Sequence, residues 1–277
     1  MLRTKYYYIN GKIINAENAR IHVSDLAFLR GYGVFDFFRV LNYKPVFLDD
    51  HINRFIKSGS LLNLELPFSK EILKEQIQKL IDANKLNNAS IQLFLTGGYA
   101  EDGFTPAQPN FIMREDELPN YDPVLYSNGI KLIKLKYQRE IPETKITNYL
   151  NAIKMLKEMK KKDALDILYY NDNFITETSR ANFFIIDHDD IIYTAKDNVL
   201  KGVTRQKIIQ LAKNHYKVKE KNISIEDLNK AKEAFITSTT KEVMPVVNVD
   251  NNIVGKGIPG TITKHLMKLF KEFVAWG

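Results

Sequence analysis

A polar segment with two prolines, residues 114–123, divides the chain into two stretches and most constrains its fold. Proline has no backbone N–H and restricts the residue before it, so such a segment is typical of a linker. A length of 277 residues also suits two modest domains. We therefore predict an N-terminal α+β domain over residues 1–113, an interdomain linker over 114–124 and a C-terminal domain over 125–277.

The first stretch mixes strand and helix patterns. Asn10-Gly11 between β-rich runs predicts a hairpin over residues 6–14. Helical spacing of apolar residues predicts one helix from Asp50 and another after Ser69, which suits an N-cap. Further strands are expected at residues 34–41, 45–48, 91–96 and 110–113.

The second stretch is richer in strands. Strands are expected at residues 130–135, 165–170, 182–186, 191–194, 234–237 and 243–249. Helices are expected at residues 149–161, 204–215 and 260–273. This mixture predicts two α+β domains with a cleft between them.

Composition limits the classes of function. The net charge of +7 raises the question of nucleic acid, but the lysines are scattered. Their densest run, residues 160–162, falls at the end of a predicted helix, where cations suit the helix dipole, so we expect no nucleic-acid partner. The chain has no Cys, which excludes disulfides and thiolate metal sites, and we expect no metal. It shows no apolar signal region or membrane-length run, so we expect a cytoplasmic protein.

Residues 175–184 contain the most informative single residue. Glu177 lies among small polar residues directly before an apolar strand, an arrangement that can direct its carboxylate from a strand end into a cleft. A buried carboxylate needs a strong partner, such as the protonated ring nitrogen of a bound pyridine. The alternative is a solvated glutamate in a surface turn.

Other residues supply the remaining parts of a pyridoxal phosphate site. Lys145 stands alone before a predicted helix, and a lysine can form a Schiff base with the cofactor aldehyde. Gly202 opens another helix, whose free N–H groups suit a phosphate. Thr239 or Thr240 can add a hydroxyl, and Arg54 a cationic fork. Each of these features alone is more often a surface residue, a cap or an ion pair.

Taken together and in this order, these motifs resemble the fold-type IV family of pyridoxal phosphate enzymes. The resemblance covers residues 6–270, and its most specific motifs are residues 175–183, 200–205 and 237–242; residues 30–35 and 51–55 support it. It implies an α+β fold with a small N-terminal α/β sandwich and a larger C-terminal barrel-like sheet with helices. The cofactor would lie between the domains.

The resemblance also implies roles for individual residues. Lys145 would be the Schiff-base lysine and the catalytic base, and Glu177 would pair with the ring nitrogen. Leu200 would pack on the ring, and Tyr149 matches a tyrosine near the cofactor's phenolic oxygen, although its offset from the lysine is one residue shorter. The phosphate would be held by residues from both halves of the chain: Arg54, Gly202, Val203, Thr204, Thr239 and Thr240.

The chain departs from the family where the substrate carboxylate is held. Phe35 occupies the place of a tyrosine of the D-amino-acid enzymes, and residues 95–104 contain none of the Arg or His of their carboxylate trap. Arg30, Arg180 and Lys241 are candidates for a substitute clamp, with structural ion pairs as the alternative. The family is built on homodimers, so we expect a homodimer in which residues near Arg30 enter the neighbouring site.

The resemblance predicts a ping-pong aminotransferase acting between an amino acid and a keto acid such as 2-oxoglutarate or pyruvate. D-amino acids are favoured as substrates. A branched-chain L-amino-acid aminotransferase is the second hypothesis, and aminodeoxychorismate lyase is the third. The non-enzyme alternative is a basic binding protein, which would not need Lys145, Glu177 and Arg54 together.

Overall fold

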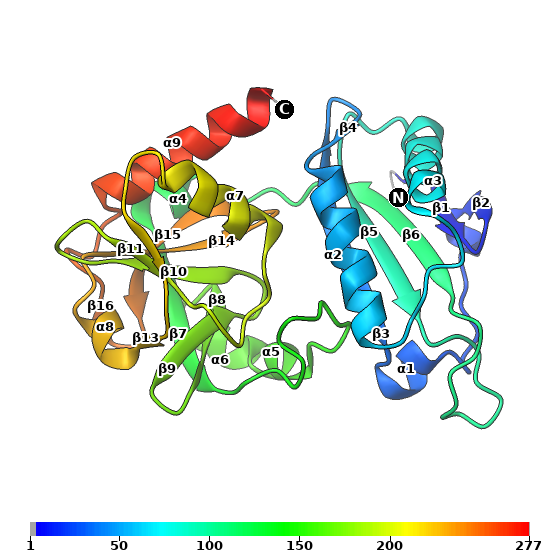
Figure 1. The fold of residues 1–277 in the computed structure, drawn as a ribbon, viewed down its shortest axis with the longest axis horizontal. Helices are drawn as coiled ribbons and strands as arrows, with labels where there is room; N and C mark the ends of the chain where they lie inside the picture. The colour runs from blue at the N-terminus through cyan, green and yellow to red at the C-terminus, as the bar shows by residue number, and fades with distance from the viewer. Residues whose placement is uncertain (1–3, 277) are drawn as a thin grey trace. The chain divides into compact units, whose positions relative to one another are not determined.

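The computed structural model describes residues 4–276 and divides into two compact units. The first unit contains the chain up to Pro119 together with Thr144–Asn148. The second unit contains Asn120–Glu143 and the chain from Tyr149 onward. The predicted α+β class is confirmed in both units (Figure 1).

The first unit contains a sheet with strand order β2-β1-β6-β5-β3-β4. Every pair of neighbouring strands in this sheet is antiparallel. At the predicted hairpin, Asn10 has φ 45° and Gly11 has φ 91°, as a two-residue turn of this type requires. The strands are β1 (Tyr6–Ile9), β2 (Lys12–Asn15), β3 (Gly33–Leu41), β4 (Lys44–Pro45), β5 (Asn88–Thr96) and β6 (Phe111–Glu117).

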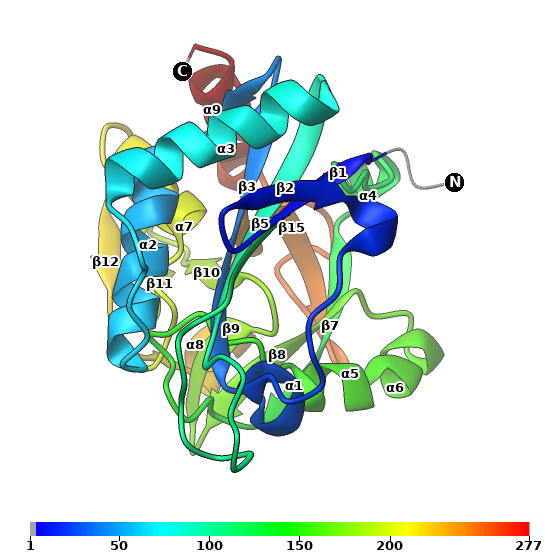
Figure 2. The ribbon, with the colours of Figure 1, turned by 90° about the vertical axis from the view of Figure 1, so that its right-hand side faces the viewer.

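Two amphipathic helices cover one face of this sheet (Figures 1 and 2). They are α2 (Leu48–Leu61) and α3 (Lys70–Asn84), and the short helices of the unit are η1 (Ala16–Asn18) and α1 (Leu26–Arg30). Ser69 caps α3 as predicted, because its hydroxyl accepts a hydrogen bond from the N–H of Ile72. The buried core includes Phe38, Ile52, Phe55, Leu73, Ile77, Leu93 and Phe111.

The segment Thr144–Asn148 completes the first unit by pairing with the edge of β3. The N–H of Phe35 donates to the carbonyl of Lys145 at 2.9 Å, and the N–H of Thr147 donates to the carbonyl of Gly33 at 3.1 Å. An antiparallel bridge links the same two segments. The backbone of the candidate catalytic lysine is therefore fixed to the first unit.

A carboxyl group is buried inside this unit at Glu115. Its Oε2 accepts a hydrogen bond from Asn84 Nδ2 at 2.8 Å, whereas its Oε1 has no partner among the described residues. Burial, together with the charge of Asp116, raises the pKa of Glu115 to about 7, although the hydrogen bond from Asn84 lowers it. The folded protein therefore binds a proton here that the unfolded chain releases near pH 4.5.

This proton makes stability depend on pH. As the pH rises from about 4.5 to 7, the unfolded state binds fewer protons than the folded state, so stability falls through this window. We expect Glu115→Gln to raise the free energy of unfolding at pH 8 by about 1–3 kcal/mol, with little change at pH 4.5. Urea unfolding at both pH values measures this, with the exposed Glu75→Gln as control. An equal effect at both pH values would contradict it.

The second unit is built on a barrel. Strands β10-β14-β15-β7-β8-β9 follow one another in the sheet, and β9 pairs back with β10 to close it. The closing pair is Glu177 and Asn182. The predicted barrel-like sheet is confirmed. The strands of this unit are β7 (Ile130–Lys136), β8 (Asp166–Asn171), β9 (Phe174–Thr178), β10 (Asn182–Ile186), β11 (Ile192–Thr194), β12 (Val218–Glu220), β13 (Ile223–Ser224), β14 (Glu233–Ser238), β15 (Glu242–Val249) and β16 (Asn252–Ile253).

Helices accompany the barrel in the second unit. They are α4 (Val124–Asn128), α5 (Leu150–Lys154), α6 (Leu156–Lys161), α7 (Val203–Ala212), α8 (Ile225–Asn229) and α9 (Thr261–Trp276). The barrel core is apolar and includes Leu132, Leu168, Phe183, Ile185, Ile236, Met244 and Val246. Glu233 caps α9, because its carboxylate accepts hydrogen bonds from the N–H groups of Ile262 and Thr263.

Some sequence expectations differ from the structure. Strand β6 continues to Glu117, so the first four residues of the expected linker belong to a sheet, and the chain passes to the second unit after Pro119. The strand expected at residues 45–48 is wrong beyond Pro45, because Phe47 adopts φ 54° and α2 then begins. The helix expected over residues 149–161 is divided at Met155.

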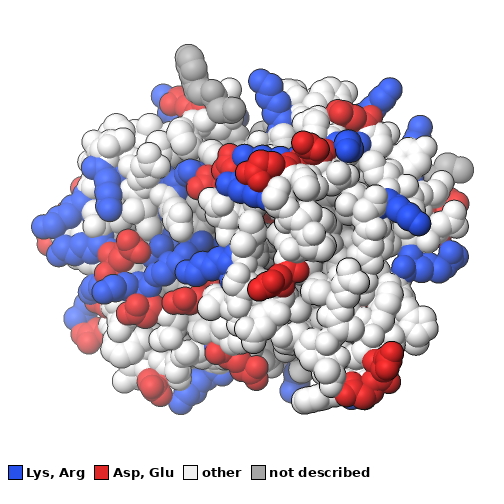
Figure 3. Space-filling view, turned by 45° about the vertical axis from the view of Figure 1, so that its right-hand side comes forward, with Lys and Arg blue, Asp and Glu red and all other residues white. Residues whose placement is uncertain are grey.

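Charge is distributed over the surface. Basic and acidic side chains occur side by side over the face shown in Figure 3. The lysine run at residues 160–162 lies at the end of α6, as expected, and Lys162 pairs with Glu158 at 3.4 Å. Among residues 4–276, no helix has the length and apolar character needed to cross a membrane.

Candidate active site

Lys145 lies beside Phe35 in the first unit. Its Nζ is 4.4 Å from the centroid of the Phe35 ring, and its backbone N–H donates to Ser58 Oγ at 3.2 Å. The ring and the hydrogen-bonded backbone restrict the positions that the amine can take. Two residues assigned from the sequence, the candidate catalytic lysine and the candidate substrate contact, are thus brought together.

Arg54 forms a buried network in the same unit. Its Nε and Nη2 donate to the two oxygens of Asp36, each at 2.8 Å, and His51 Nδ1 lies 2.7 Å from Asp36 Oδ1. The side chain of Arg54 is 12% exposed and that of Asp36 is fully buried. Arg54 therefore forms an ion pair, which was the alternative to a phosphate-binding role. This ion pair is buried and not on the surface.

Glu177 is buried on β9 in the second unit, which excludes the solvated surface glutamate. Its Oε1 accepts a hydrogen bond from Arg139 Nη2. Its Oε2 accepts from Asn182 Nδ2 at 3.2 Å and from the N–H of Leu200 at 3.1 Å. The guanidinium compensates the buried charge, and the other donors fix the orientation of the carboxylate.

A helix N-terminus lies next to this carboxylate network. Asn182 Nδ2 also donates to the carbonyl of Leu200 at 2.8 Å, and α7 begins at Val203 with Gly202 as its N-cap. A Cβ on Gly202 would lie 2.2 Å from Asn182 Oδ1, so only glycine fits beside this amide. No side chain of the described residues caps α7, and the N–H groups of Val203 and Thr204 face the helix start, where an anion binds favourably.

The remaining predicted cofactor residues of this unit lie in turns. Thr239 and Thr240 are half-buried in the turn that joins β14 to β15. Leu200 is half-buried and lies shortly before the start of α7. The predicted helix N-terminus is confirmed as a structural feature, whereas the roles of these residues stay predictions.

Tyr149 shares the electrostatic environment of Glu177. Burial raises the pKa of the Tyr149 hydroxyl, and the charge of Glu177 raises it further. The charges of Arg139 and Arg180 oppose this rise in the pKa. These four side chains therefore form one cluster within the second unit.

The three candidate clamp cations differ in their surroundings. Arg180 and Arg30 are exposed, and Lys241 is 1% exposed with its Nζ 5.4 Å from the centroid of the Tyr121 ring. None of the three has a carboxylate within ion-pair distance among residues 4–276. The structural ion pairs that we considered as the alternative are therefore absent from the described part of the chain. Arg30 ends α1 and donates to the carbonyl of Leu29.

Sequence reasoning missed three residues of these networks. Arg139 follows β7 without any periodic pattern that would mark it. Asn182 lies within the quoted motif, but nothing in the sequence shows that it bonds to Glu177. Asp36 did carry a signal, because it shares a strand face with the buried Val34 and Phe38, and a carboxylate on such a face needs a cation.

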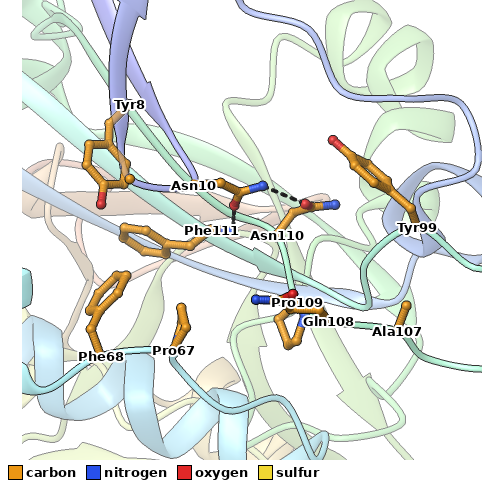
Figure 4. A pocket seen from close by; sticks show the side chains of 11 residues that line it. Tyr8, Asn10, Pro67, Phe68, Tyr99, Ala107, Gln108, Pro109, Asn110 and Phe111 are labelled. Carbon is orange, nitrogen blue, oxygen red and sulfur yellow. Dashed lines mark hydrogen bonds between the residues drawn. The ribbon is translucent and has the colours of Figure 1, made fainter.

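The first unit also contains a pocket of about 580 Å³ (Figure 4). Tyr8, Phe68 and Phe111 form its aromatic side, and Asn10 donates to Asn110 Oδ1 at 2.7 Å on its polar side. None of the predicted site residues lines it. Its volume is suitable for a small molecule, but the chemistry of the candidate site lies elsewhere.

The residues present fit pyridoxal phosphate. The buried, hydrogen-bonded carboxylate of Glu177 suits a protonated pyridine nitrogen, and the uncapped start of α7 suits a phosphate. The close approach of Gly202 to Asn182 keeps these two features adjacent. Lys145 and Arg54 supply an amine and a guanidinium in the first unit.

Comparisons with known proteins identify the family of the chain. The model of the amino-transferase class IV family matches residues 33–249. A putative branched-chain-amino-acid aminotransferase of Methanocaldococcus jannaschii is 30% identical, over 98% of this chain and 97% of the relative. A D-alanine aminotransferase of Listeria monocytogenes is 31% identical, over 95% and 94% of the two chains.

Solved structures show the same fold. The branched-chain amino acid aminotransferase of Escherichia coli superposes with a TM-score of 0.90 at 26% identity, over 98% of this chain and 95% of that one. Another branched-chain amino acid aminotransferase of the same fold was determined with pyridoxamine 5'-phosphate. The chain therefore belongs to the class IV aminotransferases, a family of pyridoxal phosphate-dependent transaminases.

Proposed function

We propose that this transaminase moves the amino group of a D-amino acid to a keto acid such as 2-oxoglutarate or pyruvate. The observation that carries the transaminase chemistry is the buried Glu177 carboxylate, held by Arg139, Asn182 and the N–H of Leu200. The D-alanine aminotransferase relative at 31% identity supports the preference for D-amino acids. A homodimer is part of the proposal, and its mass in solution would test it.

Pyridoxal phosphate, when bound, supplies an electron-withdrawing ring that stabilises negative charge at the substrate Cα. We assign to Lys145 the covalent attachment of the cofactor and the transfer of a proton between the substrate Cα and C4′ of the cofactor. Glu177 would keep the ring nitrogen protonated, and Arg139 compensates the carboxylate's own buried charge.

The other residues hold the cofactor in place. Arg54 and the N–H groups of Val203 and Thr204 would bind the phosphate, and Gly202 would allow the close approach of the backbone. A hydroxyl of Thr239 or Thr240 adds a further hydrogen bond. Leu200 would pack on the ring, and Tyr149 would contact its phenolic oxygen.

A branched-chain L-amino-acid aminotransferase is the second candidate. It is supported by the Methanocaldococcus jannaschii relative and by the Escherichia coli structure. The aromatic ring of Phe35 beside Lys145 also offers an apolar surface to an aliphatic substrate side chain. Aminodeoxychorismate lyase remains a third hypothesis, and it differs because its reaction needs no keto acid.

One experiment separates these candidates. The purified protein is loaded with pyridoxal phosphate, and D-alanine, D-glutamate, L-leucine and L-glutamate are then added separately without a keto acid. We expect the D-amino acids to remove the visible absorption of the bound cofactor, and a keto acid to restore it. A response to L-leucine without a response to either D-amino acid would favour the branched-chain enzyme. Pyruvate release from aminodeoxychorismate without a keto acid would indicate the lyase.

Arg180 provides a test of the substitute carboxylate clamp. Its charge acts on the Tyr149 hydroxyl, and no carboxylate of the described residues neutralises it. We expect Arg180→Ala to raise the KM of the amino acid by about 10- to 100-fold, the value of a charge-assisted hydrogen bond. The visible absorption of the cofactor should remain. Lys241→Met tests the buried cation in the same way.

The control is Arg114→Ala, which removes an exposed arginine of the first unit that pairs with Asp116. Steady-state rates at several amino acid concentrations separate KM from kcat. If the KM of the Arg180 variant equals that of the control, Arg180 does not bind the substrate carboxylate.

A further inference from the structure

We propose that Asp36 is a positioning residue that orients Arg54 toward the cofactor phosphate. This inference rests on the proposed role of Arg54 as a phosphate ligand. Asp36 would not contact the phosphate itself, and it would act only through the guanidinium of Arg54.

The geometry of the ion pair supports this role. Asp36 lies on β3 on the face covered by α2, and it is fully buried. Arg54 approaches it side-on, because Nε donates to Oδ2 and Nη2 donates to Oδ1, each at 2.8 Å. This contact uses one edge of the planar guanidinium and leaves the two N–H groups of Nη1 on the opposite side. The carboxylate therefore fixes the direction in which the remaining donors point.

His51 completes the network as a neutral donor. Its Nδ1 is 2.7 Å from Asp36 Oδ1 and 3.2 Å from Arg54 Nη2. A protonated Nδ1 satisfies the carboxylate, whereas a bare Nδ1 would place two lone pairs in contact at 2.7 Å, so Nδ1 carries the hydrogen. Burial lowers the pKa of His51 despite the raising effect of Asp36, and the charges of Arg54 and Lys145 lower it further. The imidazole is then neutral at pH 7.

Asp36 stays ionised under these conditions. Burial alone would raise the pKa of its carboxyl, but the charge of Arg54 and the hydrogen bonds from His51 and Arg54 hold it well below the usual range. The Phe37 N–H adds a hydrogen bond to Oδ1 at 2.7 Å. One negative and one positive charge therefore cancel within the buried network, and a bound phosphate meets Arg54 in a fixed orientation.

An alternative is that the pair only stabilises the first unit. A purely structural pair would affect every ligand equally, whereas a positioning role affects only ligands that carry the phosphate. The ratio of the dissociation constants of pyridoxal and pyridoxal phosphate measures the phosphate contribution. We expect Asp36→Asn to weaken the binding of pyridoxal phosphate by about 10- to 100-fold and that of pyridoxal by less than about threefold.

A matched control comes from the other buried aspartate of the unit. Asp25 is 1% exposed and accepts hydrogen bonds from Thr96, Asn110 and the Ala27 N–H. Asp25→Asn should reduce stability but leave the ratio of the two dissociation constants unchanged. An Asp36→Asn variant that retains the wild-type ratio would overturn the proposal, even if it binds both ligands more weakly.

The double variant covers the case in which Asp36→Asn does not fold. Asp36→Asn combined with Arg54→Met removes both charges, and its ratio should equal that of Arg54→Met alone, because Asp36 acts only through Arg54. A lower ratio in the double variant would show that Asp36 acts by another route. Failure of the wild type to bind pyridoxal phosphate would instead disprove the proposed function. A wild-type ratio in Arg54→Met would disprove the phosphate role of Arg54.

Discussion

Replacing Lys145 with alanine is expected to slow transamination by about 10⁴-fold or more, because the proposed function assigns both the covalent link and the proton transfer to this one side chain. The structure fixes this lysine closely, through the pairing of its segment with β3 and the Phe35 ring 4.4 Å from Nζ. A water molecule cannot occupy the same position with the same basicity. Single-turnover rates with a D-amino acid measure the loss.

The assignment of Lys145 can also be checked chemically. Borohydride reduction of the loaded wild type should attach the cofactor to the peptide that contains Lys145, and the variant should carry no attached cofactor. Lys57→Ala is the matched control, since Lys57 is an exposed lysine on α2 of the same unit. A Lys145 variant with the activity of the Lys57 variant would refute the catalytic role.

Glu177→Gln is the second change with a large expected effect. A neutral amide cannot keep the pyridine nitrogen protonated, so the ring withdraws electrons less strongly and kcat should fall by about 10²- to 10⁴-fold. The hydrogen bonds from Asn182 and Leu200 can still form to the amide oxygen. We therefore expect the variant to bind the cofactor with an altered visible spectrum, although its kcat is strongly reduced.

The partner of Glu177 complicates this test. The substitution leaves the guanidinium of Arg139 without its buried carboxylate, which typically costs about 3–5 kcal/mol of stability. Thermal unfolding should accompany the kinetics, and the double variant with Arg139→Met restores charge balance. Glu226→Gln, on the exposed surface of α8, is the control. An unchanged kcat in a folded Glu177→Gln enzyme would remove Glu177 from the mechanism.

Local patterns predicted much of the fold. The Asn10-Gly11 turn, the Ser69 cap and the start of α7 follow from the chemistry of a few adjacent residues, and the structure contains all three. The same reasoning failed at Phe47, where a left-handed backbone on an aromatic residue has no local signal. Long-range pairing also left no signal, as the placement of Thr144–Asn148 in the first unit demonstrates.

The candidate site was predictable in part for the same reason. Lys145 and Glu177 could be proposed because their chemical types and order resemble a known family, and the structure gives Glu177 the predicted burial. Arg139 became visible only in the structure, because its contact with Glu177 joins residues 38 positions apart. Asp36 could have been found from strand periodicity, which places its carboxylate on the helix-covered face.

The pairing of Thr144–Asn148 with β3 has a consequence for synthesis on the ribosome. Strand β3 emerges early, but the edge that it offers near Gly33 and Phe35 finds its partner only after residue 148 has left the exit tunnel. Unpaired strand edges are prone to association with other chains. The nascent chain must therefore protect this edge while more than a hundred further residues are translated at about 5–20 residues per second. The first unit would then be complete only when Thr144–Asn148 pairs with β3.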